Sequence, residues 1–399
     1  MTISRRVLLR ATIAAGFLPL APNMGFAADW AALTAEAKGQ TVYFNAWAGS
    51  ETINAYIAWA GEQVKARYGV TLEHVKITDA AEVVRRVRDE VKAGKSEGSV
   101  DLVWINGENF RAMKTDKLLF GPFATELPNF KFVDTVGKPT TLNDFAEPTD
   151  GLESPWGMAQ LTFFGDGAKI SSPPMSMIGL IEFAKTNPGR VSYPAPPDFH
   201  GTTFVKQALI ETIAGGSQLS RPATKEQFEA VSAPTFALLD NLRPHLWRKG
   251  EQYPQSQAQL KQMLADGELL MALTFNPNEP ANLVASKEVP ATTVAWQHTA
   301  GTVGNTHFVA IPINSKSSAG AQMVADFLLS PEAQARKADL KTWGDPTVLA
   351  LSKLSADETK LFEGGEVAGS VKSPAPAIPE PHGSWVPLIE AAWLEHYGK

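Results

Sequence analysis

The chain has 399 residues, 44% of them apolar, and its 42 acidic residues outnumber the 36 basic ones, so that the formal net charge is −6 with histidine neutral. An acidic chain without a basic block does not suit nucleic acid or anionic lipid as a partner. The chain contains no cysteine. Disulfides, thiolate metal sites, iron–sulfur clusters, a cysteine nucleophile and a cysteine-linked lipid anchor are therefore excluded.

Residues 1–27 predict an export signal. Arg5, Arg6 and Arg10 precede an apolar run at 11–22, which is well short of the ~20 residues that span a bilayer, and small residues follow it. The paired arginines resemble the twin-arginine signal, with an ordinary secretory signal as the alternative. Cleavage near Ala27/Ala28 would leave 372 residues with 33 basic and 42 acidic side chains, a net charge of −9. We expect a periplasmic protein without direct membrane insertion.

The next segment predicts alternating strands and helices. An apolar strand at 41–44 is followed by a loop at 45–49 and a helix that Ser50 caps and Gly69 ends. A strand at 70–77, a helix that stops at Gly94 and a strand at 100–105 complete the pattern. The order β-α-β-α-β predicts a parallel sheet with helices on both faces, and the length of the chain suits two such lobes.

Two loops follow the carboxyl ends of these strands, which is where α/β sheets bind ligands. The first offers Asn45, Trp47 and Glu51, and the second offers Asn106, Glu108 and Asn109. A tryptophan between a strand end and a helix cap is poorly explained as core, so we expect Trp47 in a cleft. By the same reasoning Ser50 is a helix cap, and Trp104 is a buried strand residue.

The remainder of the chain predicts a second α/β unit after an irregular, proline-rich region at 121–155. A strand at 154–164 leaves one lobe for the other. The further elements expected are helices at 204–214, 227–242 and 256–267, strands at 269–275 and 307–312, a helix around 321–328, a helix capped by Ser330, and a proline-rich tail at 373–381.

Three runs carry a family resemblance: Gly-Glu-Leu-Leu-Met-Ala-Leu-Thr-Phe-Asn-Pro (267–277), Gly-Asn-Thr-His-Phe-Val-Ala-Ile-Pro (304–312) and Phe-Leu-Leu-Ser-Pro-Glu-Ala-Gln (327–334). They resemble the family 1 extracellular solute-binding proteins of bacterial ABC importers, and most of all a subgroup linked to thiamine import. The resemblance implies a two-lobed clamshell of the type II periplasmic-binding-protein fold, each lobe a mainly parallel sheet with helices on both faces. It also implies a monomer that closes on a small solute and docks on a permease in the inner membrane.

The resemblance also implies discontinuous lobes. Lobe one would comprise 28–155 plus 306–342, and lobe two 160–303 plus 345–399. The hinge crossings would lie near 156–160, 303–306 and 342–345.

Further ligand candidates come from the hinge crossings and from the cleft-facing ends of lobe two. Asp198 opens a lobe-two helix, where it can either cap the helix or pair with a cation. The others are Trp156, Phe275, Asn276, Asn278, Asn305, Thr306, Trp343, Asp345 and Trp385.

The candidate cleft combines aromatic rings with carboxylates, which together favour a cation. We expect a flat or quaternary cation such as thiamine, with a polyamine or a sugar as alternatives. Ferric iron is disfavoured because iron-binding members of the family use adjacent tyrosines, and none of the six tyrosines here is adjacent to another.

The function could also be that of a sensor for a membrane receptor or of an exported enzyme. The chain lacks the Gly-x-Ser-x-Gly, His-Glu-x-x-His and Gly-x-Gly-x-x-Gly patterns of hydrolases, metalloproteases and dinucleotide enzymes. Its seven histidines show no metal-ligand spacing. We therefore expect neither catalysis nor a cofactor.

Overall fold

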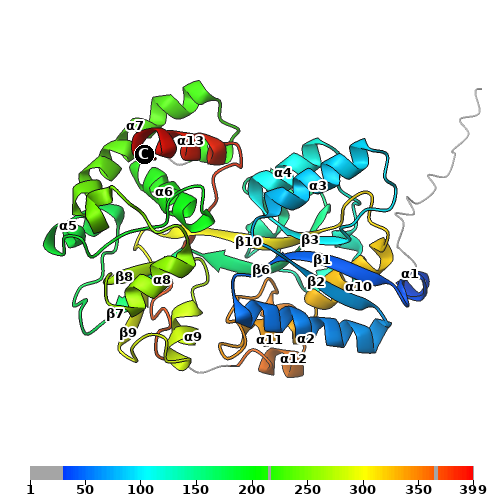
Figure 1. Cartoon of the computed structure of the whole chain (residues 1–399). Helices are drawn as coiled ribbons and strands as arrows, with labels where there is room; N and C mark the ends of the chain where they lie inside the picture. The colour runs from blue at the N-terminus through cyan, green and yellow to red at the C-terminus, as the bar shows by residue number, and fades with distance from the viewer. Residues whose placement is uncertain (1–29, 214–216, 364–366, 399) are drawn as a thin grey trace, which may run out of the picture.

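The computed structural model describes residues 30–213, 217–363 and 367–398, and these form two lobes with strands β6 and β10 running between them (Figure 1). The expected export signal at 1–27 lies outside the described residues. Within the described ranges, no helix combines the length and the apolar character needed to cross a membrane.

The sheet of the first lobe has a parallel centre. β1 (Thr41–Trp47) lies between β2 (Thr71–Ile77) and β3 (Leu102–Ile105) and is parallel to both. β10 (Thr302–Ala310) adds antiparallel to β3, and β6 (Glu153–Gln160) adds antiparallel to β10. β11 (Ala377–Pro379) pairs parallel with the start of β10. The β-α-β-α-β expectation for the N-terminal segment is confirmed.

Helices cover both faces of this sheet, as expected. α1 (Trp30–Ala37), α2 (Glu51–Tyr68) and α10 (Ser318–Leu328) pack on one face, and α3 (Ala80–Lys92) and α4 (Gly107–Thr115) lie on the other (Figure 1). Gly69 ends α2 with a φ of 70°, and the Ser330 side chain caps α11 (Pro331–Ala338). Ser50 stands at the N-cap position of α2 but makes no side-chain capping bond.

The expected loop at 45–49 begins too early. β1 continues through Trp47, and Asn45 is paired in register with Val75 and Val103. Asn45 is fully buried, donates to the Tyr43 carbonyl and accepts from Arg86. A buried asparagine inside a strand has no sequence signature, because its polarity indicates a loop unless neighbouring elements supply partners.

The second lobe surrounds a three-stranded sheet in which β7 (Thr162–Asp166) lies between β8 (Met271–Thr274) and β9 (Thr293–Trp296). Both pairings are antiparallel, so the expectation of a mainly parallel sheet in this lobe is wrong. Apolar strands buried on both faces look alike in parallel and antiparallel sheets, so residue pattern cannot set their direction. The helices of this lobe are α5 (Met177–Thr186), α6 (Phe199–Thr212), α7 (Lys225–Leu242), α8 (Gln257–Ala265), α9 (Glu279–Ala285) and α13 (Trp385–Tyr397).

Short elements complete the chain. They are α12 (Ala356–Lys360), the hairpin strands β4 (Asn143–Asp144) and β5 (Glu147–Pro148), and the 3-10 turns η1 (Ala124–Glu126), η2 (Pro128–Phe132), η3 (Pro139–Leu142), η4 (Ser217–Ser220), η5 (Arg243–His245), η6 (Trp247–Gly250) and η7 (Leu351–Lys353).

The hydrophobic cores show where the chain passes between lobes. Trp156 and Val309 belong to the core of the first lobe, whereas Ala159 and Val303, on the same two strands, belong to that of the second. Val348 and Leu349 lie in the first core, although the expected division assigns 345–399 to the second lobe. The chain therefore stays with the first lobe beyond residue 345.

Candidate functional site

The start of α4 faces the second lobe and is held in place by hydrogen bonds between side chains and backbone groups. The Asn106 side chain donates to the Thr306 carbonyl on β10 at 2.5 Å, and the Gly107 N–H donates to an Asp144 carboxylate oxygen at 2.5 Å. Gly107 has a φ of 59°, and a Cβ there would lie 2.6 Å from the ring of Phe145. Glycine is therefore required at this position, since both the backbone angle and the close ring exclude a side chain.

The hairpin β4–β5 brings Phe145 to the second lobe. Its two-residue turn has a φ of 43° at Phe145 and 61° at Ala146, which is a conformation that favours glycine or asparagine. The Phe145 carbonyl accepts from the Gly383 N–H at 3.2 Å, and His382 lies 3.6 Å from the Glu147 carboxylate. The turn thus holds its strained residues in contact with the opposite lobe.

Lys206 on α6 reaches this junction from the second lobe. It is 1% exposed, and its Nζ lies 2.6 Å from Oε2 of Glu380. The same ammonium lies 4.6 Å from the centre of the Phe145 ring and 5.4 Å from that of Phe199. Lys206 is therefore enclosed by one carboxylate and two aromatic faces drawn from both lobes, the typical surroundings of a bound ammonium.

Carboxylates outnumber Lys206 at this junction. Glu108 on α4 interacts electrostatically with Lys206, Glu380 and Glu390, and Asp144 with Glu108 and Glu380. Glu390 on α13 accepts a hydrogen bond from Thr202 at 2.8 Å. We call Glu108, Asp144, Glu380, Glu390 and Lys206 the interlobe acidic group. With every member ionised, four negative charges face one positive charge.

Burial perturbs the acids of this group. It raises the pKa of Glu108 to about 7, with Lys206 opposing the rise and Glu390 adding to it. Burial likewise raises the pKa of Glu380 and of Glu390, which Lys206 again opposes, and raises that of Asp144 well above its usual value. The group can therefore gain negative charge near neutral pH, and a cation placed among these acids would favour that gain.

Two buried acceptors, one within the group and one beside it, lack partners among the described residues. Oδ1 of Asp144 and Oδ1 of Asn305 accept no hydrogen bond from the described residues, although the two side chains are 1% and 5% exposed. Asn305 uses its Nδ2 to donate to Oε1 of Glu380 at 3.2 Å. Buried acceptors without donors are rare in proteins, and these two add acceptor capacity next to the carboxylates.

A second buried lysine lies beside β6 and β10, the strands that run between the lobes. Lys337 donates to Asp345 at 2.7 Å and to the Trp156 carbonyl, and His307 lies 3.1 Å from the other oxygen of Asp345. Lys337 and His307 hold the pKa of Asp345 below its usual value although burial opposes this, and burial lowers the pKa of Lys337. We call Lys337, Asp345 and His307 the hinge network.

Tryptophans surround the hinge network. Trp104, Trp156 and Trp343 pack against one another with ring centres 5.0 to 5.9 Å apart, and Lys337 lies over two of these rings. Trp156 and Trp343 are 0% and 3% exposed. The structure therefore places Trp156, Trp343 and Asp345 in the packing of the hinge.

The remaining lobe-two asparagines also serve the hinge. The side chain of Asn276 donates to the Trp343 carbonyl at 3.0 Å, and that of Asn278 donates to the Gly344 carbonyl at 2.6 Å. Thr306 bonds through its hydroxyl to Thr140 at 2.9 Å. The two asparagine bonds therefore join the second lobe to residues 343–344 of the first.

The other expected site residues lie in different surroundings. Asp198 caps α6 by accepting from the N–H groups of His200 and Gly201. Phe275 is buried and packs edge-to-face on Phe199. Asn109 donates to Glu108 at 3.3 Å. Trp385 is 2% exposed in the core of the second lobe, and its Nε1 donates to the Arg221 carbonyl, so its ring is a core element rather than part of a cleft surface.

Trp47 and Glu51 have neighbours outside the interlobe acidic group. Trp47 is half-buried at the end of β1 and packs on the first core with its ring close to Gly49. Glu51 lines a cavity of about 330 Å³ with Tyr56, Arg336 and Lys341. Basic residues outnumber acidic ones in the lining of this cavity, whereas acids outnumber the lysine in the interlobe acidic group.

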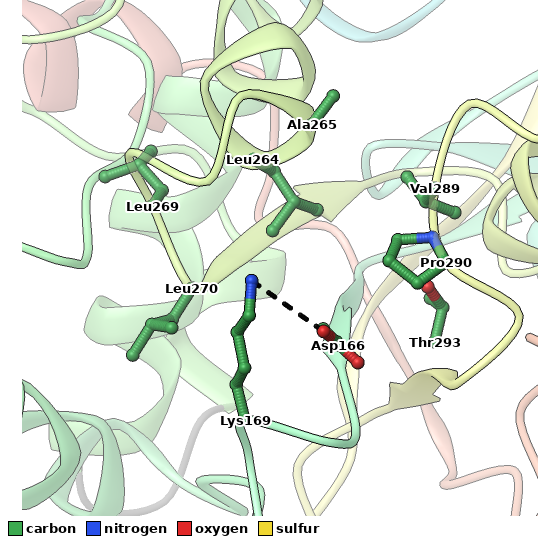
Figure 2. Close-up of a pocket in the computed structure, with 9 residues that line it drawn as sticks. All are labelled: Asp166, Lys169, Leu264, Ala265, Leu269, Leu270, Val289, Pro290 and Thr293. Atoms are coloured by element: carbon green, nitrogen blue, oxygen red, sulfur yellow. Dashed lines mark ion pairs between the residues drawn. The ribbon is translucent and has the colours of Figure 1, made fainter.

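Another cavity, of about 50 Å³, lies in the second lobe, and its lining includes Asp166 and Lys169, whose charged atoms are 3.8 Å apart (Figure 2). Its walls come from the second lobe, and it is too small for an organic solute. Across the described ranges, no three His, Asp or Glu side chains are arranged to hold a metal ion.

Sequence reasoning missed Lys206, Glu380, Glu390, Phe145 and Phe199. Lys206 had a signal: α6 is buried along most of its length, and a lysine inside such a helix requires a charged partner. Glu380 and Glu390 had none, because Glu380 falls in the expected proline-rich tail at 373–381 and no element was expected around Glu390.

Comparisons with known proteins agree with this architecture. The family model for bacterial extracellular solute-binding proteins matches residues 58–363. Protein YnjB of Escherichia coli (strain K12) is 44% identical over 387 residues, which is 96% of this chain and 97% of YnjB.

Solved structures share the fold at low identity. The spermidine/putrescine ABC transporter substrate-binding protein PotD from Streptococcus pneumoniae has a TM-score of 0.61 and 14% identity, covering 90% of this chain and 100% of PotD. A periplasmic thiamin binding protein has a TM-score of 0.59 and 14% identity, covering 90% and 95%. The two lobes thus form the periplasmic-binding-protein fold, and the chain belongs to the bacterial extracellular solute-binding proteins.

Proposed function

We propose that the protein is the substrate-binding component of an ABC importer and that it holds a small organic cation between its lobes. The observation that carries the choice of a cation is the excess of carboxylates in the interlobe acidic group, where Glu108, Asp144, Glu380 and Glu390 surround one lysine. Family membership and the solved structures of similar fold support the transport role.

The charges give a mechanism of closure. Glu108 belongs to the first lobe and Glu390 to the second, and each raises the energy of the other's ionised form. A cation between them replaces this repulsion with two attractions, one to each lobe. Closure therefore requires the bound solute to bridge the lobes, and the closed form is the one that a permease recognises.

Aromatic rings favour a flat solute. Phe199 is 43% exposed beside Lys206 and packs on Phe275, so one face of the site is aromatic. A cation over such a face gains ~0.5–2 kcal/mol. A thiamine-like cation fits both features, and a polyamine fits the carboxylates alone. The acids make a sugar less suitable, because hydroxyl groups do not offset the excess of carboxylates over Lys206.

We further propose the organisation in which the protein acts. An export signal at residues 1–27 would carry it to the periplasm, where it works as a monomer with an inner-membrane permease. Lobe one comprises about 30–155 plus 306–362, and lobe two about 160–303 plus 377–398. The solute contacts are Glu108, Asn109, Phe199, Phe275, Asn305 and Glu390. Sensing for a membrane receptor is the alternative role of the same site.

A binding screen tests this function. Isothermal titration of the refolded protein with thiamine, choline, putrescine and glucose should give saturable binding of a cation and none of glucose. Glu390→Gln should weaken that binding at least about tenfold, since a charge-assisted contact is lost. Glu182→Gln, which removes an exposed charge on α5, is the matched control and should leave it unchanged. Binding of glucose alone would refute the choice of a cation.

A further inference from the structure

We propose that Lys206 is a specificity-determining residue that fills one of two ammonium positions in the interlobe site and thereby limits the solute to a single positive charge there. The inference rests on the proposed function, because it takes the site to be one for cations. It separates the monocations from the diamines and polyamines that the carboxylates alone would also accept.

The surroundings of Lys206 are those of a ligand ammonium group. Its Nζ contacts Glu380 at 2.6 Å and lies within 5.4 Å of the ring centres of Phe145 and Phe199. Phe145 comes from the first lobe, so this position, like that of a bound solute, touches both lobes. Lys206 is 1% exposed, and the position is therefore closed to a second ammonium group while the lysine remains.

Glu380 is fully engaged by protein donors. Lys206 donates to its Oε2 and Asn305 donates to its Oε1 at 3.2 Å, and the side chain is 3% exposed. Glu108 and Glu390, in contrast, are half-buried. A solute therefore meets two available carboxylates that repel each other, and one positive charge between them satisfies both.

Removal of the lysine should reopen the second position. Lys206→Ala leaves Glu380, the two phenylalanine rings and the orphan acceptor of Asn305 around an empty space. A diamine could then place one ammonium group beside Glu380 and the other between Glu108 and Glu390. A monoamine can occupy only one of these positions at a time.

The test compares diamines with monoamines of equal length. Titration calorimetry would measure binding of 1,3-diaminopropane, putrescine and cadaverine against propylamine, butylamine and pentylamine. In the wild-type protein each diamine should bind no more than about threefold tighter than the monoamine of equal length. In Lys206→Ala at least one diamine should bind about tenfold or more tighter than the monoamine of equal length. A factor of this size corresponds to one charge-assisted contact.

Two further variants test whether the tighter diamine binding comes from the position that the Lys206 ammonium group vacates. Lys206→Ala combined with Glu380→Gln should lose the gain, because the vacated position then lacks its carboxylate. Lys169→Ala removes the same charge from the distant pair in Figure 2 and should leave the diamine-to-monoamine ratio at its wild-type value.

The inference fails if wild-type protein binds a diamine tenfold tighter than its monoamine, or if folded Lys206→Ala shows no diamine gain. If Lys206→Ala does not fold, the ratios of diamine to monoamine affinity in the wild-type protein decide the inference alone. If the wild-type protein binds no cation, the proposed function is refuted. A diamine gain in Lys206→Ala would still support the assignment of Lys206.

Discussion

Lys206 and Lys337, the two lysines that are buried in the described part of the chain, occupy similar surroundings but differ in charge balance. Lys337 at the hinge faces one carboxylate, Asp345, with His307 on that acid's other oxygen, and tryptophan rings enclose the pair. Lys206 at the interlobe junction faces Glu380 directly and three further carboxylates nearby. Both lysines lie over aromatic rings and both are at most 1% exposed.

This difference in charge balance distinguishes a structural cluster from a candidate binding site. The hinge network is compensated, and Asp345 keeps a pKa below its usual value because its partners stabilise the ionised form. The interlobe acidic group is not compensated, and its acids have raised pKa values. An uncompensated set of buried and half-buried charges lowers stability unless a further charge arrives, which is the behaviour expected of a binding site.

Breaking the hinge network should have the largest effect. Lys337→Met leaves Asp345 ionised and buried without its cation, which should lower the free energy of unfolding by about 3–5 kcal/mol. Urea denaturation at pH 7 would measure the loss. The double variant Lys337→Met with Asp345→Asn should recover part of it, because the uncompensated charge is gone. A single variant as stable as the double one would contradict this account of the hinge.

Neutralising the interlobe acids should alter binding more than folding. Glu108→Gln should weaken binding of the cationic solute at least about tenfold, or about 1.4 kcal/mol, because an ionic contact becomes a neutral one. The ligand-free protein should be as stable as wild type or more so, since repulsion with Glu390 is relieved. Calorimetry and thermal denaturation would measure the two effects. A large loss of ligand-free stability would instead make Glu108 a structural residue.

Binding should depend on pH through Glu108. Its pKa of about 7 means that the carboxylate is ionised above neutral pH and protonated below it. Affinity for a cation should therefore rise with pH up to about 7, by at most about tenfold per unit, and then level off. Titrations between pH 5 and pH 8 would show the slope, and Glu108→Gln should reduce it.

The ligand-free protein should show the opposite trend for this group. Its folded pKa is raised from 4.5 to about 7, so between these values the folded state holds a proton that the unfolded state has released. The contribution of Glu108 to stability therefore falls as pH rises through this window. The stability of Glu108→Gln relative to wild type should accordingly increase with pH, and a constant difference would exclude the raised pKa.

The smallest effect concerns the hairpin that carries Phe145. Ala146→Gly places glycine at a φ of 61° and should stabilise the protein by about 1 kcal/mol, because an L side chain is disfavoured there. Solute affinity should not change, since the Phe145 ring keeps its place. Ala184→Gly in α5 is the control. It should lower the stability of the protein, because glycine weakens a helix interior.

Much of the fold was predictable from local patterns. The alternating pattern of β2, the apolar run of β3, the glycine after α2 and the serine and proline that open α11 each act within a few residues. The loop at 106–109 was predicted as a site because strand ends share an edge, and Glu108 lies in the interlobe acidic group. The partners of Glu108 were not predictable, because Lys206 and Glu390 are distant in sequence.

The amino-acid sequence by itself determined the family, the strands β1, β2 and β3, and the helices α2, α3, α6, α7, α8, α10 and α11, since these follow from periodicity, capping residues and short local runs. Only the tertiary structure decided the antiparallel order of β7, β8 and β9, the separation of Trp385 from the interlobe surface, and the charge around each buried lysine. The physical reason is that strand direction, burial and electrostatic balance are properties of neighbours in space. Lys206 and Lys337 are alike as residues, and the number of carboxylates around each one distinguishes them.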